Sequence, residues 1–432
     1  MKATIEQLAA TLETALGSGS VTTGASALAS YNVDGKSPAI LCAPKDQDEV
    51  SAALRLCAEA RAGVIPWGGG TAIRLGNIPR QADVILELQR LNKLIEHDDA
   101  NLTASAQAGI KVADLQQILG RQRQFLPVEP PRPELATIGG TAAANINGPR
   151  RIFYGGVRDL VIGMKVVLAD GQQIKAGGKV VKNVAGYDMC KLFVGSLGTL
   201  GVITEATFKM APIPESAATL VAAGPLSQGL QLVDQLMQST LLPAAVAVVS
   251  AEATGVNSGR PAVAVWAEGF EEAVARHLRE IQELAARMEL RAEVLREEAH
   301  RIFWEQIRDF GSSGENLVYR VTVPAASLAE VVETIDRWSR SEGAARFVAH
   351  AGSGTVWIES GADPAGAAWF PRLTALAKER RGHAVMVAAP PELKQGVDVW
   401  GDPPESLSLM REIKRQFDPN TVLNPGRFIA AL

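Results

Sequence analysis

The first half of the chain alternates between helical and strand-like spacing of its hydrophobic positions. Residues 44–63 predict an amphipathic helix, because Asp46 can cap its first turn, Glu49 follows three residues later and Gly63 can end it. An apolar strand is predicted directly afterwards at residues 64–66, and it leads into a glycine-rich loop.

The same alternation continues after the loop. Residues 82–88 predict a buried strand, and the alternating pattern of residues 101–109 predicts another. Residues 111–122 return to helical spacing. The predicted unit is therefore helix, strand, glycine-rich loop, strand.

A stretch of small residues separates this unit from a predicted β-hairpin. Residues 136–148 contain two adjacent glycines and four alanines. A long apolar strand follows and ends in the Asp170-Gly171 turn, after which residues 172–177 are expected to pair back. The last strand of this region stops at Pro212, so we place a boundary near residue 215.

The pattern changes after this boundary. Residues 216–390 alternate apolar strands with charged helices, which is typical of an α+β domain with one antiparallel sheet. Residues 391–432 are expected to form a helix followed by a short apolar segment at the C-terminus. The expected organisation is an α+β fold with an N-terminal domain at 1–215, a second domain at 216–390 and a C-terminal segment at 391–432.

Composition narrows the class of protein. The chain has 432 residues, 47% of them hydrophobic and 21% charged, and a net charge of -4. This charge gives no overall attraction to nucleic acid or anionic lipid. No apolar run reaches the ~18 residues that a membrane span needs, and the amphipathic start lacks the features of a signal peptide. The three scattered cysteines exclude an iron–sulfur cluster built by this chain alone and fit a reducing cytosol.

The glycine triplet Gly68–Gly70 is the first candidate for chemistry. A nucleoside-triphosphate loop needs a lysine after its last glycine, but Thr71 and Ala72 follow here. The spacing also fails the dinucleotide fingerprint G-x-G-x-x-G. What remains is either a loop whose N–H groups face a diphosphate or an ordinary turn between strands. Two further small-residue segments, at 136–148 and 194–204, favour one long ligand threaded between all three.

At these residues the sequence resembles a known family. The segments are PWGGGTAI, ATIGGTAAANINGPRRIFYGGVRDLVIGMKVVLADG, KNVAGYD, KLFVGSLGTLGVITE and the C-terminal FDPNTVLNPGRF. Together they resemble the vanillyl-alcohol-oxidase (PCMH-type) class of FAD flavoproteins, and within it the FAD-binding E subunits of bacterial glycolate oxidases. The resemblance implies two α+β subdomains that cradle FAD and an α+β cap domain over the flavin.

The resemblance also implies which residues bind FAD. The diphosphate side has Pro66, Trp67, Gly68, Gly69, Gly70 and Thr71; the flavin side has Thr137, Gly139, Gly140, Thr141 and Asn145; the rest of the cradle has Gly186, Tyr187, Gly195, Gly198, Thr199 and Val202; and Asn424 reaches the isoalloxazine ring. The alternative for Asn424 is a turn residue that ends a helix. Some members tether the flavin through a histidine near the position of Thr71, and none lies there in this chain, so non-covalent FAD is expected.

The metal motif of related 2-hydroxy-acid dehydrogenases is only partly present. The segment AHAGSGTVW keeps His350, but Ser353, Thr355 and Trp357 replace the aspartate, the asparagine and the second histidine. The family also has an acidic ligand beside a later histidine. Here that histidine is His383, and Ala384 follows it, so the acidic ligand is missing. One imidazole cannot hold a hard divalent cation, so no metal is expected.

Three side chains remain as candidates for the oxidation chemistry. Arg308 and Arg320 could bind a substrate carboxylate, and His350 could act as a base. Structural ion pairs and a structural histidine are the alternatives for these residues. The basic segments 148–151 and 380–383 are expected at the solvated surface or in contacts with a partner.

The resemblance implies a subunit of a glycolate oxidase complex. Its partners would be a paralogous flavoprotein subunit with the intact catalytic site and an iron–sulfur subunit. The complex would be cytoplasmic or peripheral to the inner membrane through these partners. This chain would then support the oxidation of glycolate to glyoxylate rather than carry the metal-dependent step. The alternatives are a self-sufficient FAD-dependent 2-hydroxy-acid dehydrogenase and a scaffold without flavin.

Overall fold

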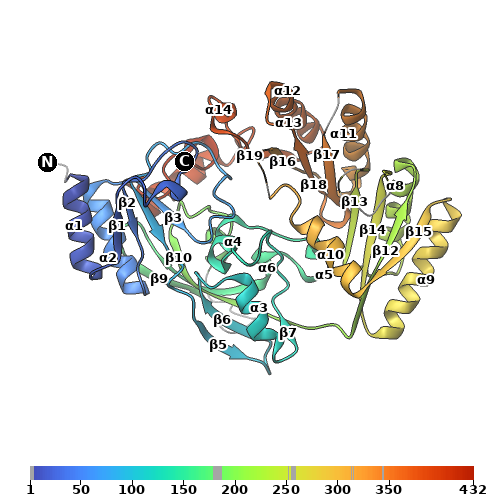
Figure 1. The fold of residues 1–432 in the computed structure, drawn as a ribbon, viewed down its shortest axis with the longest axis horizontal. Coiled ribbons are helices and arrows are strands. Elements are labelled where there is room, and N and C mark those ends of the chain that lie inside the picture. Colours follow the sequence, from blue (N-terminus) through green and yellow to red (C-terminus); the bar gives the residue numbers. More distant parts are fainter. Residues whose placement is uncertain are drawn as a thin grey trace.

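The computed structural model describes residues 4–178, 187–251, 253, 259–312, 314, 316–342 and 345–432. Two lobes lie side by side (Figure 1), and the last part of the chain returns from the second lobe to the first. This arrangement has the mixed α+β character that the sequence predicts: the small N-terminal sheet is mostly parallel, and the other sheets are antiparallel.

The first lobe begins with a small four-stranded sheet of order β1-β2-β4-β3. Its elements are α1 (Ile5–Leu16), β1 (Val21–Thr23), η1 (Ala29–Tyr31), β2 (Ile40–Cys42), α2 (Gln47–Ala60), β3 (Val64–Trp67) and β4 (Val84–Glu87). Strand β4 pairs in parallel with both β2 and β3, whereas β1 is antiparallel to β2. Helices α1 and α2 pack their leucines and Val50 against this sheet to form one core.

The predicted helix at residues 44–63 is confirmed, but it ends earlier than expected. Asp46 caps α2 by accepting a hydrogen bond from the Glu49 N–H at 2.9 Å. The helix ends at Arg61, which adopts left-handed geometry with φ of 55°. Gly63 lies beyond this turn and donates its N–H to the Asp83 carboxylate at 2.8 Å. The glycine therefore serves the junction with β4 rather than the helix end.

The second part of the first lobe is a five-stranded antiparallel sheet of order β5-β6-β10-β8-β9. Its elements are β5 (Leu94–Asp98), β6 (Thr103–Gln107), α3 (Val112–Gly120), β7 (Gln124–Phe125), α4 (Ile138–Ala144), α5 (Arg151–Tyr154), α6 (Val157–Leu160), β8 (Val161–Val167), β9 (Gln173–Gly177), α7 (Cys190–Phe193), β10 (Val202–Lys209) and β11 (Ala211–Pro212). The predicted hairpin is confirmed, because β8 and β9 pair around Gly171, whose φ of 86° suits glycine.

The second lobe is built on one eight-stranded antiparallel sheet of order β15-β12-β14-β13-β17-β18-β16-β19. Its elements are β12 (Ser216–Ala223), α8 (Leu226–Gln238), β13 (Ala245–Val249), β14 (Ala262–Gly269), α9 (Glu271–Arg287), β15 (Arg291–Arg296), α10 (Glu297–Arg308), β16 (Leu317–Thr322), η2 (Ala325–Ser327), α11 (Leu328–Glu342), β17 (Arg346–His350), η3 (Ala351–Ser353), β18 (Thr355–Ser360), α12 (Pro364–Ala367), α13 (Trp369–Glu379) and β19 (His383–Ala388).

The two faces of this sheet differ in what covers them. Helices α8, α9, α11 and α13 pack on one face and form the largest apolar core. On the other face α10 covers part of the strands, and α5 of the first lobe contacts β13 and η3. Gly352 in η3 lies so close to Ile152 of α5 that a Cβ atom there would overlap its side chain. The second face therefore looks toward the first lobe.

The C-terminal segment packs against the first lobe. It contains α14 (Pro391–Lys394), α15 (Leu407–Phe417) and η4 (Ile429–Ala431). The segment after α15 runs beside β3: the Val64 N–H donates to the Val422 carbonyl at 2.8 Å, and the Asn424 N–H donates to the Val64 carbonyl at 2.9 Å. Strand β3 leads into the glycine loop, so the tail is placed beside that loop.

None of the described helices is long and apolar enough to cross a membrane.

A buried cation fixes the tail, and this gives a first prediction. The Lys414 ammonium donates to Asp418 at 2.7 Å and to the carbonyl oxygens of Thr199 and Leu423. Lys414→Met removes these bonds and leaves the buried Asp418 carboxylate without its countercharge. We expect the free energy of unfolding to fall by about 3–5 kcal/mol in urea titrations.

The matched control is Lys378→Met, because Lys378 and Asp402 form an ion pair in which both side chains are more than half exposed. That substitution should cost less than about 1 kcal/mol. Equal losses in the two variants would contradict a fixing role for Lys414.

Candidate cofactor-binding site

A cleft lies where the glycine loop, α4, β10 and the C-terminal tail meet. The lining residues predicted from the sequence are Pro66, Trp67, Gly68, Gly69, Gly70, Thr71, Thr137, Gly139, Gly140, Gly198, Val202 and Asn424. Segments far apart in the chain thus form one wall.

The glycine loop offers free donors to this cleft. The backbone N–H groups of Gly68, Gly69, Gly70 and Thr71 have no acceptor within the described part of the chain. Successive N–H groups of this kind form a concave site for an anion such as a diphosphate. Each hydrogen bond to a charged group contributes about 1.5–3 kcal/mol.

The glycines are needed because two segments meet at this loop. A Cβ atom on Gly69 would overlap the Leu135 carbonyl oxygen, and one on Gly68 would overlap the Thr137 hydroxyl. Gly139 in α4 also has no room for a side chain, because the Ala108 Cβ atom lies 2.6 Å from the position that a Cβ atom of Gly139 would take. Only residues without a side chain let the loop and α4 lie side by side along the cleft.

The charge of the cleft also suits an anion. Among the described residues that line it, Arg427 carries the only full charge, and it is 2% exposed. Its guanidinium donates to the carbonyl oxygens of Ile73 and Leu75, directly after the glycine loop. Burial lowers the pKa of Arg427 to about 10, and the Asp34 carboxylate partly opposes this shift. Arg427 therefore stays protonated at neutral pH.

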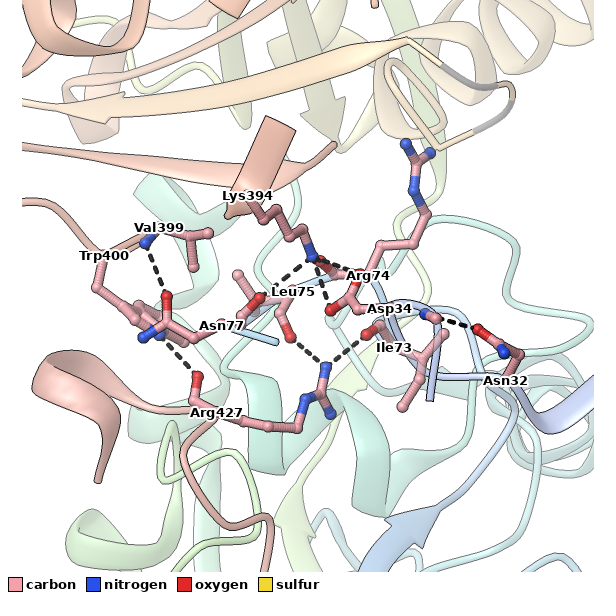
Figure 2. A network of polar contacts seen from close by, with 12 residues as sticks. Asn32, Asp34, Ile73, Arg74, Leu75, Asn77, Lys394, Val399, Trp400 and Arg427 are labelled. Atoms are coloured by element: carbon pink, nitrogen blue, oxygen red, sulfur yellow. Dashed lines mark hydrogen bonds and ion pairs between the residues drawn. The ribbon is translucent and has the colours of Figure 1, made fainter. Parts of the chain in front are cut away.

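A second buried cation holds the same loop (Figure 2). Lys394 donates to Asp34 at 2.8 Å and to the carbonyl oxygens of Arg74 and Gly76 at 2.6 and 3.2 Å. Burial lowers the pKa of Lys394, and Asp34 opposes this change. The two cations Lys394 and Arg427 thus face one carboxylate, and the surroundings of the cleft keep a positive excess.

Asn424 lies at the inner end of the cleft. It has left-handed geometry with φ of 44°, and its Nδ2 donates to the Leu197 carbonyl at 2.5 Å. Gly198, with φ of 68°, approaches it so closely that a Cβ atom would contact Asn424 Nδ2 at 3.4 Å. The tail residue and the glycine turn before β10 therefore share one corner of the site.

Several of the predicted cofactor residues lie outside the cleft lining. Thr141 turns its hydroxyl to the Thr137 carbonyl, and Thr199 turns its own to the Ser196 carbonyl. Asn145 ends α4 in left-handed geometry and packs against Gly195. Tyr187 is 96% exposed. Gly186 lies outside the described residues.

The cleft also contains residues that the motif analysis does not predict. They are Ala72, Ile73, Leu88, Ala108, Ala143, Ala144, Leu197, Gly201, Ile203 and Arg427. Most are apolar neighbours of predicted residues. Arg427 differs, because it carries a charge. It belongs to the same NPGR segment as the predicted residue Asn424, and a charged residue in that segment is the sequence signal that could have indicated its place in the cleft.

The three predicted catalytic side chains have different surroundings. Arg308 is neutralised by its neighbour, since its guanidinium binds both oxygens of Asp309 at 2.9 and 2.7 Å. His350 is 7% exposed, and its Nε2 has no hydrogen-bond partner among the described residues. Arg320 likewise has a buried Nε without a partner in the described ranges. Only Arg320 and His350 thus keep free polar atoms.

These two residues lie on the face of the eight-stranded sheet that looks toward the first lobe. In the sheet register Arg320 of β16 lies opposite Trp357 of β18, and His350 of β17 lies opposite Thr355 of β18. Trp357 and Thr355 are two residues apart on one strand, so Arg320 and His350 are on the same face. The residues do not form a metal site: no group of three histidine, cysteine or carboxylate side chains gathers anywhere in the described ranges. The donor set around His350 therefore does not fit a divalent cation.

The basic segment 148–151, expected at the solvated surface or in contacts with a partner, has two different environments: Arg151 is exposed, whereas the Arg150 side chain is mostly buried. The Arg150 side chain lies between the lobes, where it binds Glu129 at 2.9 Å and Glu268 at 3.2 Å. Its guanidinium also lies 4.4 Å from the ring centroid of Trp266. This ion pair joins the first lobe to the second, because Glu268 belongs to β14.

Comparisons with known proteins agree with these features. Residues 38–177 match the FAD binding domain family, and residues 401–428 match the C-terminal domain of FAD linked oxidases. Glycolate oxidase subunit GlcE of Escherichia coli (strain K12) is 30% identical over 352 residues, covering 78% of this chain and 85% of that protein. Glycolate oxidase subunit GlcD of Bacillus subtilis (strain 168) is 29% identical over 419 residues, covering 91% and 89%.

Among solved structures, p-cresol methylhydroxylase with substrate bound superposes with a TM-score of 0.74 at 16% identity, covering 98% of this chain and 96% of that one. This likeness shows the fold alone. The cleft described above lies within and between the two matched segments, and its free N–H groups and positive excess fit FAD.

The close contact at Gly69 predicts how FAD binding can be weakened. Gly69→Ala forces the loop away from Leu135, and overpacking of this kind costs about 1–3 kcal/mol. We expect the FAD dissociation constant, measured by titrating the apoprotein, to rise by about tenfold or more. Gly120→Ala is the control, because a Cβ atom there has open space and should leave FAD affinity unchanged. Full affinity in Gly69→Ala would contradict the proposed role of the loop.

His350 predicts a pH dependence of stability. Burial lowers the pKa of His350 to about 4 from an ordinary value of 6.5. The unfolded chain therefore binds more protons between these two values, and stability falls as the pH drops through this window. The limit for one such histidine is about 3 kcal/mol. Urea titrations near neutral pH and near pH 4 should show a smaller loss in His350→Gln than in the unaltered protein, and equal losses would contradict the assignment.

Proposed function

Because the chain belongs to the FAD-linked oxidoreductases, the family that includes the glycolate oxidase subunits, we propose that it is the FAD-binding subunit of a glycolate-oxidase-type complex. Members of this family are FAD-dependent enzymes that act on the CH–OH group of 2-hydroxy acids. One observation carries the proposal: the cleft presents backbone N–H groups suited to a diphosphate, whereas no cluster of metal ligands gathers on the sheet face beside it within the described ranges.

The proposed reaction is the oxidation of glycolate to glyoxylate. The substrate loses the hydroxyl proton and, from carbon, a hydrogen with two electrons. FAD, when bound, accepts the two electrons and this hydrogen. An iron–sulfur partner then takes the electrons onward, and it must be a separate chain because the three cysteines here are buried and scattered.

In this proposal the chain's own residues bind and orient the cofactor. The N–H groups of Gly68–Gly70 and Thr71 would hold the diphosphate. Asn424 and Arg427 would form the inner end of the site. Both line the cleft, and both donate side-chain hydrogen bonds to nearby backbone carbonyl oxygens. The glycine contacts and the buried cations would keep these donors in place without cofactor, so little ordering is needed on binding.

We further propose that FAD is held without a covalent bond. The described loop contains no histidine, and the first histidine after it is His97, whose Nε2 bonds Gln124 at 2.9 Å. The metal-dependent step would belong to a paralogous flavoprotein partner. This division explains why the FAD cleft and the metal ligands are not retained together.

A purification from the native host tests the proposal. The tagged chain should bring down a second flavoprotein and an iron–sulfur protein, and acid precipitation should release its FAD into the supernatant. Glycolate-dependent dye reduction by the chain alone should be at least about 100-fold slower than by the complex. Fast turnover by the separated chain without added metal would contradict the assignment of the metal-dependent step to a partner. Flavin that stays in the pellet would contradict non-covalent binding of FAD.

A further inference from the structure

The second face of the eight-stranded sheet carries a guanidinium with no acidic partner. Arg320 lies on β16, and within the described residues no hydrogen bond or ion pair reaches its side chain. The Trp357 ring lies beside it, with its centroid 5.7 Å from the guanidinium carbon. Arg320 is partly buried and its Nε is fully enclosed. A charge held there without an acidic partner is costly, so its retention needs a reason.

The charges around Arg320 increase this cost. Burial lowers the pKa of Arg320, and the Arg151 guanidinium on α5 lowers it further. Arg320 in turn lowers the pKa of His383, a smaller effect than the burial of that imidazole. Arg151 and His383 are exposed, so they lie where a solute could reach the group.

The acidic side chains on this face are already engaged. Glu359, diagonal to Arg320 in the sheet, binds Arg346 at 2.8 Å and also accepts from Asn316. Glu268 lies four strands away and is bound to Arg150 and Tyr154. No described carboxylate forms an ion pair with Arg320, and the one charged neighbour that shifts its pKa is another guanidinium.

The site adjoins the FAD cleft. Arg320 pairs with Val385 of β19, so both side chains are on the same face. Val385 packs in one cluster with Leu197 and Ala144, and both of these line the cleft. His350 lies on the same face with its Nε2 unpartnered, two strands or roughly 10 Å from Arg320. A small ligand held at Arg320 would thus lie between the FAD cleft and His350.

We propose that Arg320, with Arg151 at its rim and Trp357 beneath it, is a metal-independent site for the carboxylate of a small 2-hydroxy acid. This inference rests on the proposed function and adds to it a substrate subsite in this chain. A guanidinium binds a carboxylate through two parallel hydrogen bonds, and Arg320 has its donors free. The bound carboxylate supplies the negative charge that the protein does not.

Binding of oxalate to the FAD-loaded protein tests the site. Oxalate presents carboxylates without an oxidisable hydrogen, and it can be titrated while flavin absorbance and tryptophan fluorescence are recorded, with calorimetry on the apoprotein as a second readout. We expect saturable binding that survives EDTA and dialysis. Arg320→Met should weaken it at least about tenfold, Arg320→Lys should weaken it less, and neutral glycolamide should not compete.

Stability separates a binding role from a structural one. Arg320→Met removes a charge without a partner, so its melting temperature without ligand should be unchanged or higher. Oxalate should raise the melting temperature of the unaltered protein but not that of the variant. The control is Arg301→Met, which removes an exposed charge on α10 that is paired with Glu298 and Glu305, and should bind oxalate normally.

The outcomes distinguish the site from the proposed function. Oxalate binding that depends on Arg320 supports the site even if no flavin-containing complex is found. Binding that is equal in Arg320→Met, that disappears with EDTA and returns with a divalent cation, or that cannot be detected would overturn the site and leave the FAD assignment intact. A melting temperature that falls sharply in Arg320→Met, with unchanged oxalate affinity, would show a structural arginine instead.

Discussion

The FAD cleft depends on buried cations that bind backbone carbonyl oxygens between distant parts of the chain. Lys394 and Arg427 hold the segment after the glycine loop, and Lys414 holds the tail against the turn before β10. Each ammonium or guanidinium loses water on burial, and carbonyl dipoles together with Asp34 and Asp418 compensate for this loss. The glycine loop therefore reaches its final shape only when the C-terminal segment has returned to it.

This constraint also connects the two lobes. Lys394 belongs to the segment that leaves β19, and Arg150 reaches from the first lobe to Glu268 in the second. The sheet face with Arg320 and His350 is thereby held next to the FAD cleft. Both places have more positive than negative charge, and each suits one anionic group: the diphosphate of the cofactor and the carboxylate by which the proposed substrate would be held.

Much of the fold could be predicted from the sequence, because it depends on local patterns. The Asp46 cap and the hairpin at Gly171 are set by neighbouring residues, and the glycine loop is visible as a glycine triplet even though distant segments fix its shape. The surroundings of the cations could not be predicted, since Arg427 binds carbonyl oxygens about 350 residues away in the chain and a carbonyl has no sequence signature. Arg308 and Arg320 look alike as candidates, but only the structure distinguishes the neutralised side chain from the free one.

A guanidinium in the place of a metal ion, as we propose for this face, has a chemical consequence. A divalent cation binds the carboxylate and also acidifies the hydroxyl that must lose its proton. Arginine can bind and orient the carboxylate, but it does not polarise a hydroxyl in that way. His350, with a pKa near 4, is neutral at physiological pH yet is a weak base. The residues on this face are thus suited to holding a 2-hydroxy acid and poorly suited to oxidising it quickly, as expected under our proposal that the metal-dependent step belongs to a paralogous subunit.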